Sequence, residues 1–396
     1  MKIVIPKNAA KIIELLKSNT HDAYIVGGCV RDFILERIPG DWDITTSAKP
    51  KDIKRVFRRT VDTGIEHGTV TVLMGDESYE VTTYRIDGDY SDRRHPDKVT
   101  FTEDLKEDLR RRDFTINAMA YNDEAGLVDI FGGMDDLNKK IIRCVGNADE
   151  RFDEDALRIL RAIRFASQLD FDIEEDTFVA IKKHASELEA VSAERILVEI
   201  NKMLTADYPE KIEMLWECGL EKYICEGFEK ISKKDAQRLA DAVADSNKKL
   251  SNKKHIRWAK LAEGLSPEDI GGVLLNLKSD NDLIKKTVTL TEEIKNPVPR
   301  TEEEIRRCLN RIGPELFDDL CELKGENHEL KDAIIERGDA YNLKMLAVTG
   351  GDLIKLGFET GPKIGEILDN MLDKVIKDPS ANDKAGLLSE INSCRQ

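Results

Sequence analysis

The chain has 396 residues, of which 35% are charged and 40% hydrophobic, and a net charge of −16. This length exceeds one ordinary domain, so we expect two to four compact units. The negative charge excludes a protein that binds nucleic acid by bulk attraction, so a polyanion would bind only at local basic tracts such as Arg110–Arg112. No apolar run reaches the roughly 20 residues that span a bilayer. Seven scattered cysteines without a CxxC pair predict reduced thiols and a cytoplasmic protein.

Strand signals are concentrated before about residue 147. Runs rich in β-branched and aromatic residues predict strands at 23–26, 42–46, 69–74 and 78–84. A glycine turn after the first of these runs predicts the start of a helix, and Gly75–Glu77 predicts a hairpin turn between the last two. The polar stretch 87–96 holds little that could be buried, so we expect a mobile loop there.

Beyond Asp149 the pattern becomes helical. Apolar residues recur at helical spacing, as in Leu157, Leu160 and Ile163. Segments that contain proline, at 206–209 and 295–299, predict breaks between groups of helices. We therefore predict an α+β fold, in which a small mixed β-sheet with helices is followed by an all-helical remainder. The expected segments are residues 1–147, 148–208, 209–299 and 300–396.

Asp41 and Asp43 are candidate metal ligands. On a strand, residues two apart point to the same side, so these two carboxylates could share a divalent cation. Hard oxygen ligands suit Mg²⁺, and two such ions can neutralise the attacking and leaving oxygens of a nucleotidyl transfer. Glu80, on a later predicted strand, is either a third carboxylate of this site or an ordinary outward-facing residue.

Residues that could bind a nucleotide lie on both sides of these carboxylates. Gly28, in the glycine turn, would let phosphates approach backbone N–H groups at a helix start. Arg31, in the first helical turn, would reach a triphosphate. Later in the chain, Arg112 could contact phosphate, and Asp113 or Asn117 could contact the ribose. These residues predict a site where a metal meets a polyphosphate.

A second signal lies at residues 151–164. Asp155 and Arg158 are three residues apart and are expected to be neighbours on one helix face, with Arg161 and Arg164 continuing the series. One interpretation is an exposed ion pair. The other is base selection, because Asp155 could accept from the amino group of cytosine or adenine while Arg158 donates to the ring nitrogen. Guanine and uracil reverse these groups and would be rejected.

Together these motifs give the sequence a family resemblance. It resembles the class II CCA-adding tRNA nucleotidyltransferases, which share a superfamily with bacterial poly(A) polymerases. The resemblance rests on six ordered motifs, at residues 27–32, 40–44, 80–85, 111–120, 129–133 and 151–165. Looser matches follow at 192–196 and 349–354.

The resemblance implies a catalytic head (1–147), a neck with base recognition (148–208), a body (209–299) and a tRNA-binding tail (300–396). It implies that Asp41 and Asp43 are catalytic and hold Mg²⁺, and that CTP and ATP are substrates added to the 3′ end of the tRNA acceptor arm. The expected assembly is a monomer or a homodimer. The residues implied to bind nucleotide are Gly28, Arg31, Arg112, Asp155, Arg158, Arg161 and Arg164.

Several alternatives stay open within and outside this family. A poly(A) polymerase is disfavoured because the sequence has no arginine-rich C-terminal extension. An enzyme that adds only CC is disfavoured because the stretch 87–96 is intact, whereas an enzyme that adds only A has the same motifs. An inactive RNA-binding protein is disfavoured by Asp41, Asp43 and Arg158. A phosphohydrolase is disfavoured because the helical part has no His-Asp pair.

Overall fold

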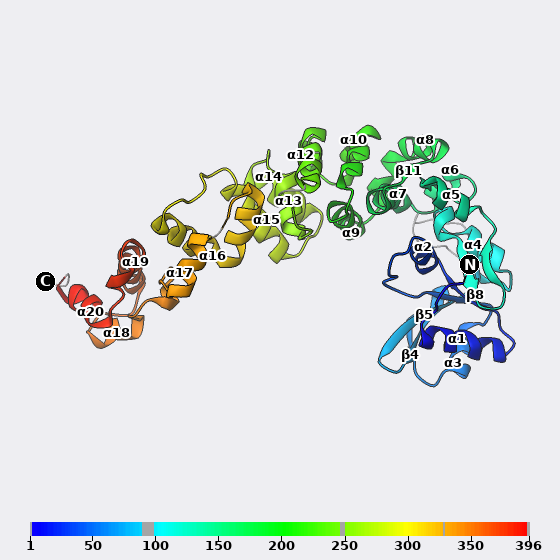
Figure 1. Cartoon of the computed structure of the whole chain (residues 1–396), viewed down its shortest axis with the longest axis horizontal. Helices are drawn as coiled ribbons and strands as arrows, with labels where there is room; N and C mark the ends of the chain where they lie inside the picture. Colours follow the sequence, from blue (N-terminus) through cyan, green and yellow to red (C-terminus); the bar gives the residue numbers. More distant parts are fainter. Residues whose placement is uncertain (1, 89–98, 246–249, 328, 394–396) are drawn as a thin grey trace. The chain divides into compact units, whose positions relative to one another are not determined.

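The computed structural model describes residues 2–88, 99–245, 250–327 and 329–393. The chain forms two compact units (Figure 1). The first unit comprises Met1–Ala240 and Val273–Ser279, and the second comprises Asp241–Gly272 and Asp280–Gln396. All of the strands that the structure describes belong to the first unit, so the prediction of an α+β fold with a helical remainder is confirmed.

A seven-stranded mixed sheet forms the centre of the head, with the strand order β3-β4-β5-β2-β1-β8-β9. Two short two-stranded sheets, β6-β7 and β10-β11, accompany it. The strands are β1 (Ala23–Val26), β2 (Ile44–Thr46), β3 (Thr60–Gly64), β4 (Thr69–Met74), β5 (Glu77–Thr83), β6 (Arg85–Asp87), β7 (Val99–Phe101), β8 (Met119–Asn122), β9 (Gly126–Asp129), β10 (Ile141–Ile142) and β11 (Asp172–Ile173). The predicted hairpin is present as β4 and β5, paired from Thr69 opposite Thr82 to Met74 opposite Glu77.

The predicted strand at 42–46 is shorter than expected. Strand β2 begins at Ile44, so Asp41 and Asp43 lie in the segment directly before it rather than on the strand. Pairing with β1 nevertheless reaches into this segment, because the amide of Val26 donates to the carbonyl of Asp43 at 3.0 Å. Strand β2 pairs in parallel with β5, with Ile44 opposite Val81.

Some helices of the first unit pack against this sheet, and others pack against one another. Helices α1 and α3 pack against the sheet (Figure 1), and α7 packs along α9. Their bounds are α1 (Lys7–Ser18), α2 (Gly28–Ile34), α3 (Pro50–Val56), α4 (Leu105–Arg110), α5 (Gly133–Lys139), α6 (Ala148–Glu154), α7 (Leu157–Leu169), α8 (Glu175–Lys183), α9 (Ala193–Leu204), α10 (Met214–Glu217) and α11 (Glu221–Ile224). The apolar residues at helical spacing, such as Leu160 and Ile163, are buried on α7 as predicted.

The second unit is helical throughout its described part. Its last helices bury one apolar cluster around Leu353, Val375 and Ile391. Buried Arg306 joins separate helices by donating to the carbonyl of Ile376 and to Asp339, at 2.8 and 2.9 Å. Its helices, two of which are shared with the first unit, are α12 (Lys233–Ala244), α13 (Lys254–Leu261), α14 (Pro267–Asn276), α15 (Asn281–Glu293), α16 (Glu302–Lys324), α17 (Glu329–Arg337), α18 (Gly350–Lys355), α19 (Pro362–Lys377) and α20 (Lys384–Ser393).

The division of the chain into head, neck, body and tail stays a prediction. The expected loop at 87–96 lies mostly outside the described residues, which end at 88 and resume at 99. Across the described ranges, no helix is both long and apolar enough to cross a membrane.

Candidate functional site

Asp41, Asp43 and Glu80 line one pocket of about 690 Å³ beside the start of strand β2. The parallel pairing of β2 and β5 explains why Asp43 lies near Glu80. Ile44 is opposite Val81, and the residues directly before them in the same register are Asp43 and Glu80. All three residues are exposed. Partial withdrawal of the Asp43 carboxyl from water raises its pKa, the charges of Glu80 and Asp41 act in the same direction, and Arg112 opposes them. Three oxygen donors around one pocket fit a hard divalent cation.

A tighter group of possible ligands lies elsewhere. Among the described residues, Asp153, His184 and Glu187 form a group whose ligand atoms all lie within 4.8 Å of one another, which the three pocket carboxylates do not. The His184 ring, however, already contacts Asp149 at 2.7 Å and Glu187 at 3.0 Å. These contacts hold α6 against the residues that follow α8, so we interpret this group as structural.

The glycine turn has two steric requirements at Gly27. Its φ of 79° and ψ of −129° belong to a region that residues with a side chain rarely adopt. A Cβ there would also lie 2.9 Å from Nη1 of Arg112. Gly28 begins α2 with an ordinary φ, and a Cβ at this position would meet only Nη2 of Arg31, at 3.7 Å. The turn therefore places Gly27 beside Arg112 and Gly28 beside Arg31.

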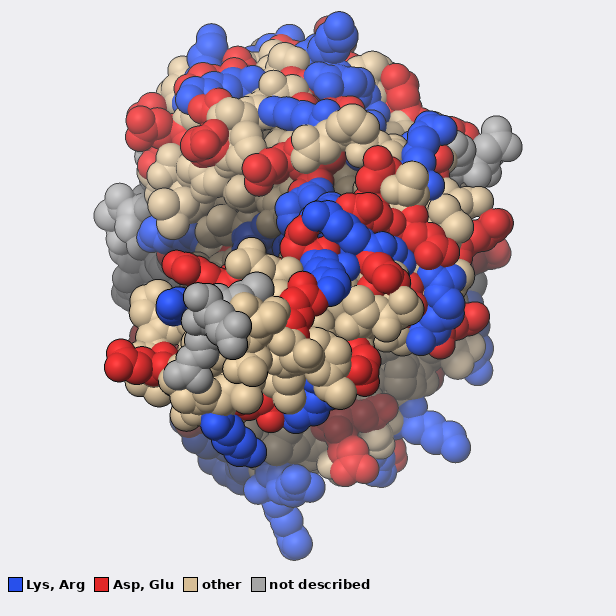
Figure 2. Space-filling model, turned by 90° about the vertical axis from the view of Figure 1, so that its left-hand side faces the viewer, with Lys and Arg blue, Asp and Glu red and all other residues tan. Residues whose placement is uncertain are grey.

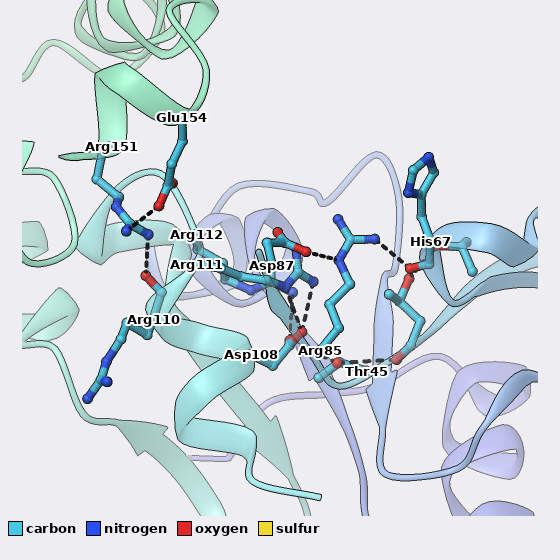
Figure 3. A network of polar contacts seen from close by, with 12 residues as sticks. Thr45, His67, Arg85, Asp87, Asp108, Arg110, Arg111, Arg112, Arg151 and Glu154 are labelled. Atoms are coloured by element: carbon cyan, nitrogen blue, oxygen red, sulfur yellow. Dashed lines mark hydrogen bonds and ion pairs between the residues drawn. The ribbon is translucent and has the colours of Figure 1, made fainter. Parts of the chain in front are cut away.

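Buried Asp108 organises the arginines that follow α4 (Figure 3). One of its oxygens accepts two hydrogen bonds from Arg111, at 2.8 and 3.0 Å, and the other accepts from Thr45 of β2 at 3.0 Å and lies 3.6 Å from Arg112. Burial alone would raise the pKa of Asp108, but the charges of Arg111 and Arg112 hold it below its ordinary value. Asp108 thus fixes Arg112 relative to the strand that follows Asp43.

A second buried carboxylate, Asp113, holds Arg161. Nε of Arg161 donates to Asp113 at 2.8 Å, and Asn117 donates to the other oxygen at 3.1 Å. Burial would raise the pKa of Asp113, but Arg161 and the hydrogen bond from Asn117 keep it well below its ordinary value. Neither Asp113 nor Asn117 is exposed, since they are 7% and 5% accessible. A ribose that contacts these side chains must therefore replace or share their present partners.

Three arginines surround the ring of Phe165. The guanidinium carbons of Arg31, Arg161 and Arg164 lie 4.9, 5.5 and 4.1 Å from its centroid, within the range of cation–π attraction. Arg164 also pairs with buried Glu199 of α9 at 3.2 Å. Burial and the neighbouring charge of Arg161 lower the pKa of Arg164 to about 10, so it stays charged at neutral pH. The structure thus brings together cations that are far apart in the sequence.

The prediction that Asp155 and Arg158 lie on one helix face is wrong. Helix α6 ends at Glu154, and Asp155 has extended backbone angles, φ −151° and ψ 101°, before α7 begins. The helix is interrupted here because one carboxylate oxygen of Asp155 accepts from the amide of Leu157 at 3.1 Å, while the other accepts from Arg195 at 2.8 Å.

Arg158 is likewise held by protein groups. Its guanidinium donates to the carbonyls of Arg151 and Arg111, at 3.1 and 3.0 Å, and to the carboxylate of Glu154. Arg151 in turn donates to the carbonyl of Arg110 (Figure 3). A ligand that contacts Asp155 or Arg158 must therefore replace or share existing partners.

Several residues of this region had no role in the sequence prediction. They are Asp108, Phe165, Arg195, Glu199 and Lys202. Burial and the charge of Arg164 lower the pKa of Lys202 from its ordinary value, whereas Glu199 and Asp41 act in the opposite direction. Lys202 therefore lies within electrostatic range of both the arginines and the carboxylate pocket. No local pattern marks it, because a lysine on an amphipathic helix is ordinary.

The fold and the site together define a nucleotidyltransferase. Carboxylates cluster around one pocket beside β2 and β5, and a glycine turn with several arginines lies within electrostatic range of them. Residues 23–143 match the family model of the poly A polymerase head domain. Residues 170–231 match that of an RNA and SrmB-binding site of polymerase A, and residues 249–391 match tRNA nucleotidyltransferase domain 2.

The chain belongs to the family of CCA-adding enzymes. It is 38% identical to the CCA-adding enzyme of Pediococcus pentosaceus, with 98% of each chain covered. The CCA-adding enzyme of Geobacillus kaustophilus is 38% identical, with 96% of this chain and 94% of the relative covered. Among solved structures, the Bacillus stearothermophilus CCA-adding enzyme in complex with CTP matches with a TM-score of 0.82, 32% identity and 99% coverage of both chains.

Proposed function

We propose that this enzyme adds C, C and A to the 3′ end of tRNA, using CTP and ATP and no nucleic-acid template. One observation carries the proposal: Arg112 adjoins the glycine turn and also acts electrostatically on Asp43 in the carboxylate pocket. A single nucleotide could therefore contact the cations with its phosphates and the carboxylate pocket with its reacting phosphate. The similar Bacillus stearothermophilus enzyme was solved with CTP.

Asp41 and Asp43 would hold Mg²⁺, with Glu80 as a third carboxylate. Bound Mg²⁺ ions would neutralise the attacking 3′ oxygen and the leaving pyrophosphate. The protein's own contribution is to keep the carboxylates close together through the parallel pairing of β2 and β5. The resident cations Arg31, Arg112 and Arg164 would bind the triphosphate.

Base selection would use Asp155 and Arg158. Cytosine and adenine both offer an amino group to a carboxylate and a ring nitrogen to a guanidinium, whereas uracil and guanine present the opposite groups. Arg195 donates to one oxygen of Asp155, and the other oxygen accepts from the amide of Leu157 at the start of α7. The incoming base would therefore meet a carboxylate whose orientation is already fixed by two protein donors.

The polyanionic substrate would bind locally rather than by bulk attraction. On the face drawn in Figure 2, Lys and Arg side chains are interspersed with Asp and Glu, in keeping with the net charge of −16. We assign the acceptor arm of tRNA to the catalytic pocket and the rest of its contacts to residues 300–396. These contacts would depend on salt less steeply than those of a uniformly basic protein.

The test is extension of a tRNA that ends at its discriminator base, resolved to single nucleotides. CTP alone should give two additions, and ATP should add a third only afterwards. A stop at CC with both nucleotides present would identify a CC-adding enzyme, and a long adenosine ladder would identify a poly(A) polymerase. Addition only to a CC-ended tRNA would identify an A-adding enzyme. No addition to any of these substrates would refute the proposal.

A further inference from the structure

Two arginines of the nucleotide site are joined by one buried amide. Nη1 of Arg31, on α2, donates to Oδ1 of Asn117 at 2.6 Å. Nδ2 of the same amide donates to Asp113 at 3.1 Å, and Asp113 accepts from Arg161 of α7 at 2.8 Å. Asn117 ends the short 3₁₀ helix Thr115–Asn117, which lies between these elements in the sequence. The contacts form a continuous polar chain from the glycine-turn helix to the helix that carries Arg161.

An asparagine suits this position for an electrostatic reason. Its carbonyl faces the cation of Arg31, and its amino group faces the anion of Asp113. A carboxylate at position 117 would stand beside Asp113, and a cationic side chain would stand beside Arg31, so either would be repelled on one side. Both ends of the amide are used within the protein, and the residue is only 5% exposed. Asn117 is therefore placed to orient other side chains rather than to contact a ligand.

We propose that Asn117 is a positioning residue for nucleotide binding, which sets the orientation of Arg31 towards the triphosphate and couples it to Arg161 through Asp113. This proposal rests on the proposed function, in which Arg31 binds the triphosphate. Arg31 is also held by Asp32, whose Oδ1 accepts from Nε at 2.8 Å. Loss of the Asn117 contact would leave Arg31 with this one carboxylate and with Phe165, and would turn its guanidinium away from its present direction.

The test replaces Asn117 by leucine, which is similar in size and has no polar end. A hydrogen bond to a charged group is worth enough to raise the KM for CTP by about 10- to 100-fold. The value of kcat should change far less, because an interaction with the bound triphosphate contributes to the ground state and the transition state alike. Unaltered KM values for CTP and ATP, within twofold of the wild type, would overturn the proposal.

Asn122→Leu is the matched control. Asn122 is equally buried, at 3% exposure, and its amide donates to the carbonyl of Ala23 and accepts from Glu124 and Ala125. This variant should lower the melting temperature without raising KM. If Asn122→Leu raised KM as much as Asn117→Leu does, the effect would be general destabilisation and the proposal would fail.

A double-mutant cycle separates the pathway through Arg31 from an independent role. Arg31→Met should raise KM, and adding Asn117→Leu to it should raise KM much less than it does in the wild type. Effects that multiply would show that Asn117 does not act through Arg31. If the leucine variant does not fold, Asn117→Ala provides the same test, because it removes both ends of the amide with a smaller side chain; a KM within twofold of the wild type would again overturn the proposal.

The wild type separates this inference from the proposed function. Wild-type enzyme that neither binds CTP in calorimetry nor extends tRNA would refute the function and the inference together. Wild-type enzyme that does both, alongside an Asn117→Leu variant with unchanged KM, would refute the inference alone.

Discussion

The carboxylate of Asp155 accepts a hydrogen bond from Arg195 at 2.8 Å, across 40 residues of sequence. Asp155 lies at the break between α6 and α7, and Arg195 lies on α9. Arg195 therefore fixes, from a separate helix, the direction of a carboxylate that we propose to read the base.

Replacement of Arg195 by methionine should weaken base selection more than it weakens catalysis. Without Arg195, Asp155 keeps only its contact with the amide of Leu157 and gains rotational freedom. A charge-assisted hydrogen bond of this kind is worth about 1.5–3 kcal/mol, so we expect discrimination between CTP and UTP to fall about tenfold or more. The measurement is the ratio of kcat/KM values for the two nucleotides. Arg195→Lys, which keeps the charge, should lose less; a ratio unchanged in the methionine variant would contradict the base-selection role of Asp155.

Asp43→Asn should abolish transfer. Glu80→Gln should instead raise the Mg²⁺ concentration required for half-maximal activity by about tenfold. Asp43 and Glu80 lie near each other because β2 and β5 pair in parallel, so both contribute charge to one pocket. Activity is measured as a function of Mg²⁺ concentration. Glu77→Gln is the control, because Glu77 lines the same pocket but is held by Asn8 and Tyr79. An equal shift in this control would argue against Glu80 as a metal ligand.

Asp113 should make the stability of the first unit depend on pH in the acid range. Its pKa is held well below its ordinary value in the folded protein, despite burial, by Arg161 and Asn117. Its contribution is therefore complete above about pH 4, the ordinary pKa of an aspartate, and is lost as the pH falls through the lower folded value. Denaturant unfolding of the wild type and of Asp113→Asn should show a smaller loss in the variant between pH 4 and pH 2.

The same variant should also be less stable at neutral pH. Removal of the Asp113 charge leaves Arg161 with only the charges of Glu199 and Asp155, and breaking such an ion pair costs about 3 kcal/mol. Equal unfolding free energies of wild type and Asp113→Asn at pH 7 would show that Asp113 and Arg161 do not stabilise each other.

Gly27→Ala and Gly28→Ala should have different consequences although the residues are adjacent. Alanine at position 27 must adopt a positive φ, which costs about 1–3 kcal/mol, and its Cβ would displace Arg112 from a distance of 2.9 Å. Alanine at position 28 fits the helix start and meets Arg31 at an ordinary 3.7 Å. Melting temperature and CTP affinity should both fall in the first variant, whereas in the second only the affinity should fall. Equal melting temperatures of the two variants would contradict this account.

The sequence predicted the elements of the head better than the partners of its side chains. The strands and the glycine turn have local signals, and these were sufficient for β1, β4 and β5. The break at Asp155 has only the aspartate itself as a local signal, because no glycine or proline interrupts residues 151–164 and the helical periodicity continues across it. One oxygen of Asp155 caps the amide of Leu157, and the other is held by Arg195, which only the folded chain brings near.

The buried partners were missed for a similar reason. Asn117 and Arg31 are 86 residues apart, and Asp108 and Thr45 are 63 apart. A single sequence shows that these residues are polar but does not show which of them meet. Asp113 is a further example, since its charge is compensated by Arg161, 48 residues away.

The position of Arg112 against Gly27 limits how this site can be redesigned. A library that randomises positions 27 and 112 together would not recover function through a smaller residue at 112, because relief of the 2.9 Å contact leaves the backbone of position 27 in a conformation that side chains oppose. Compensation would require a different path for the whole turn between β1 and α2. Engineered nucleotide preferences in this enzyme are therefore more accessible through Arg195, whose replacement alters the direction of the Asp155 side chain without reshaping this turn.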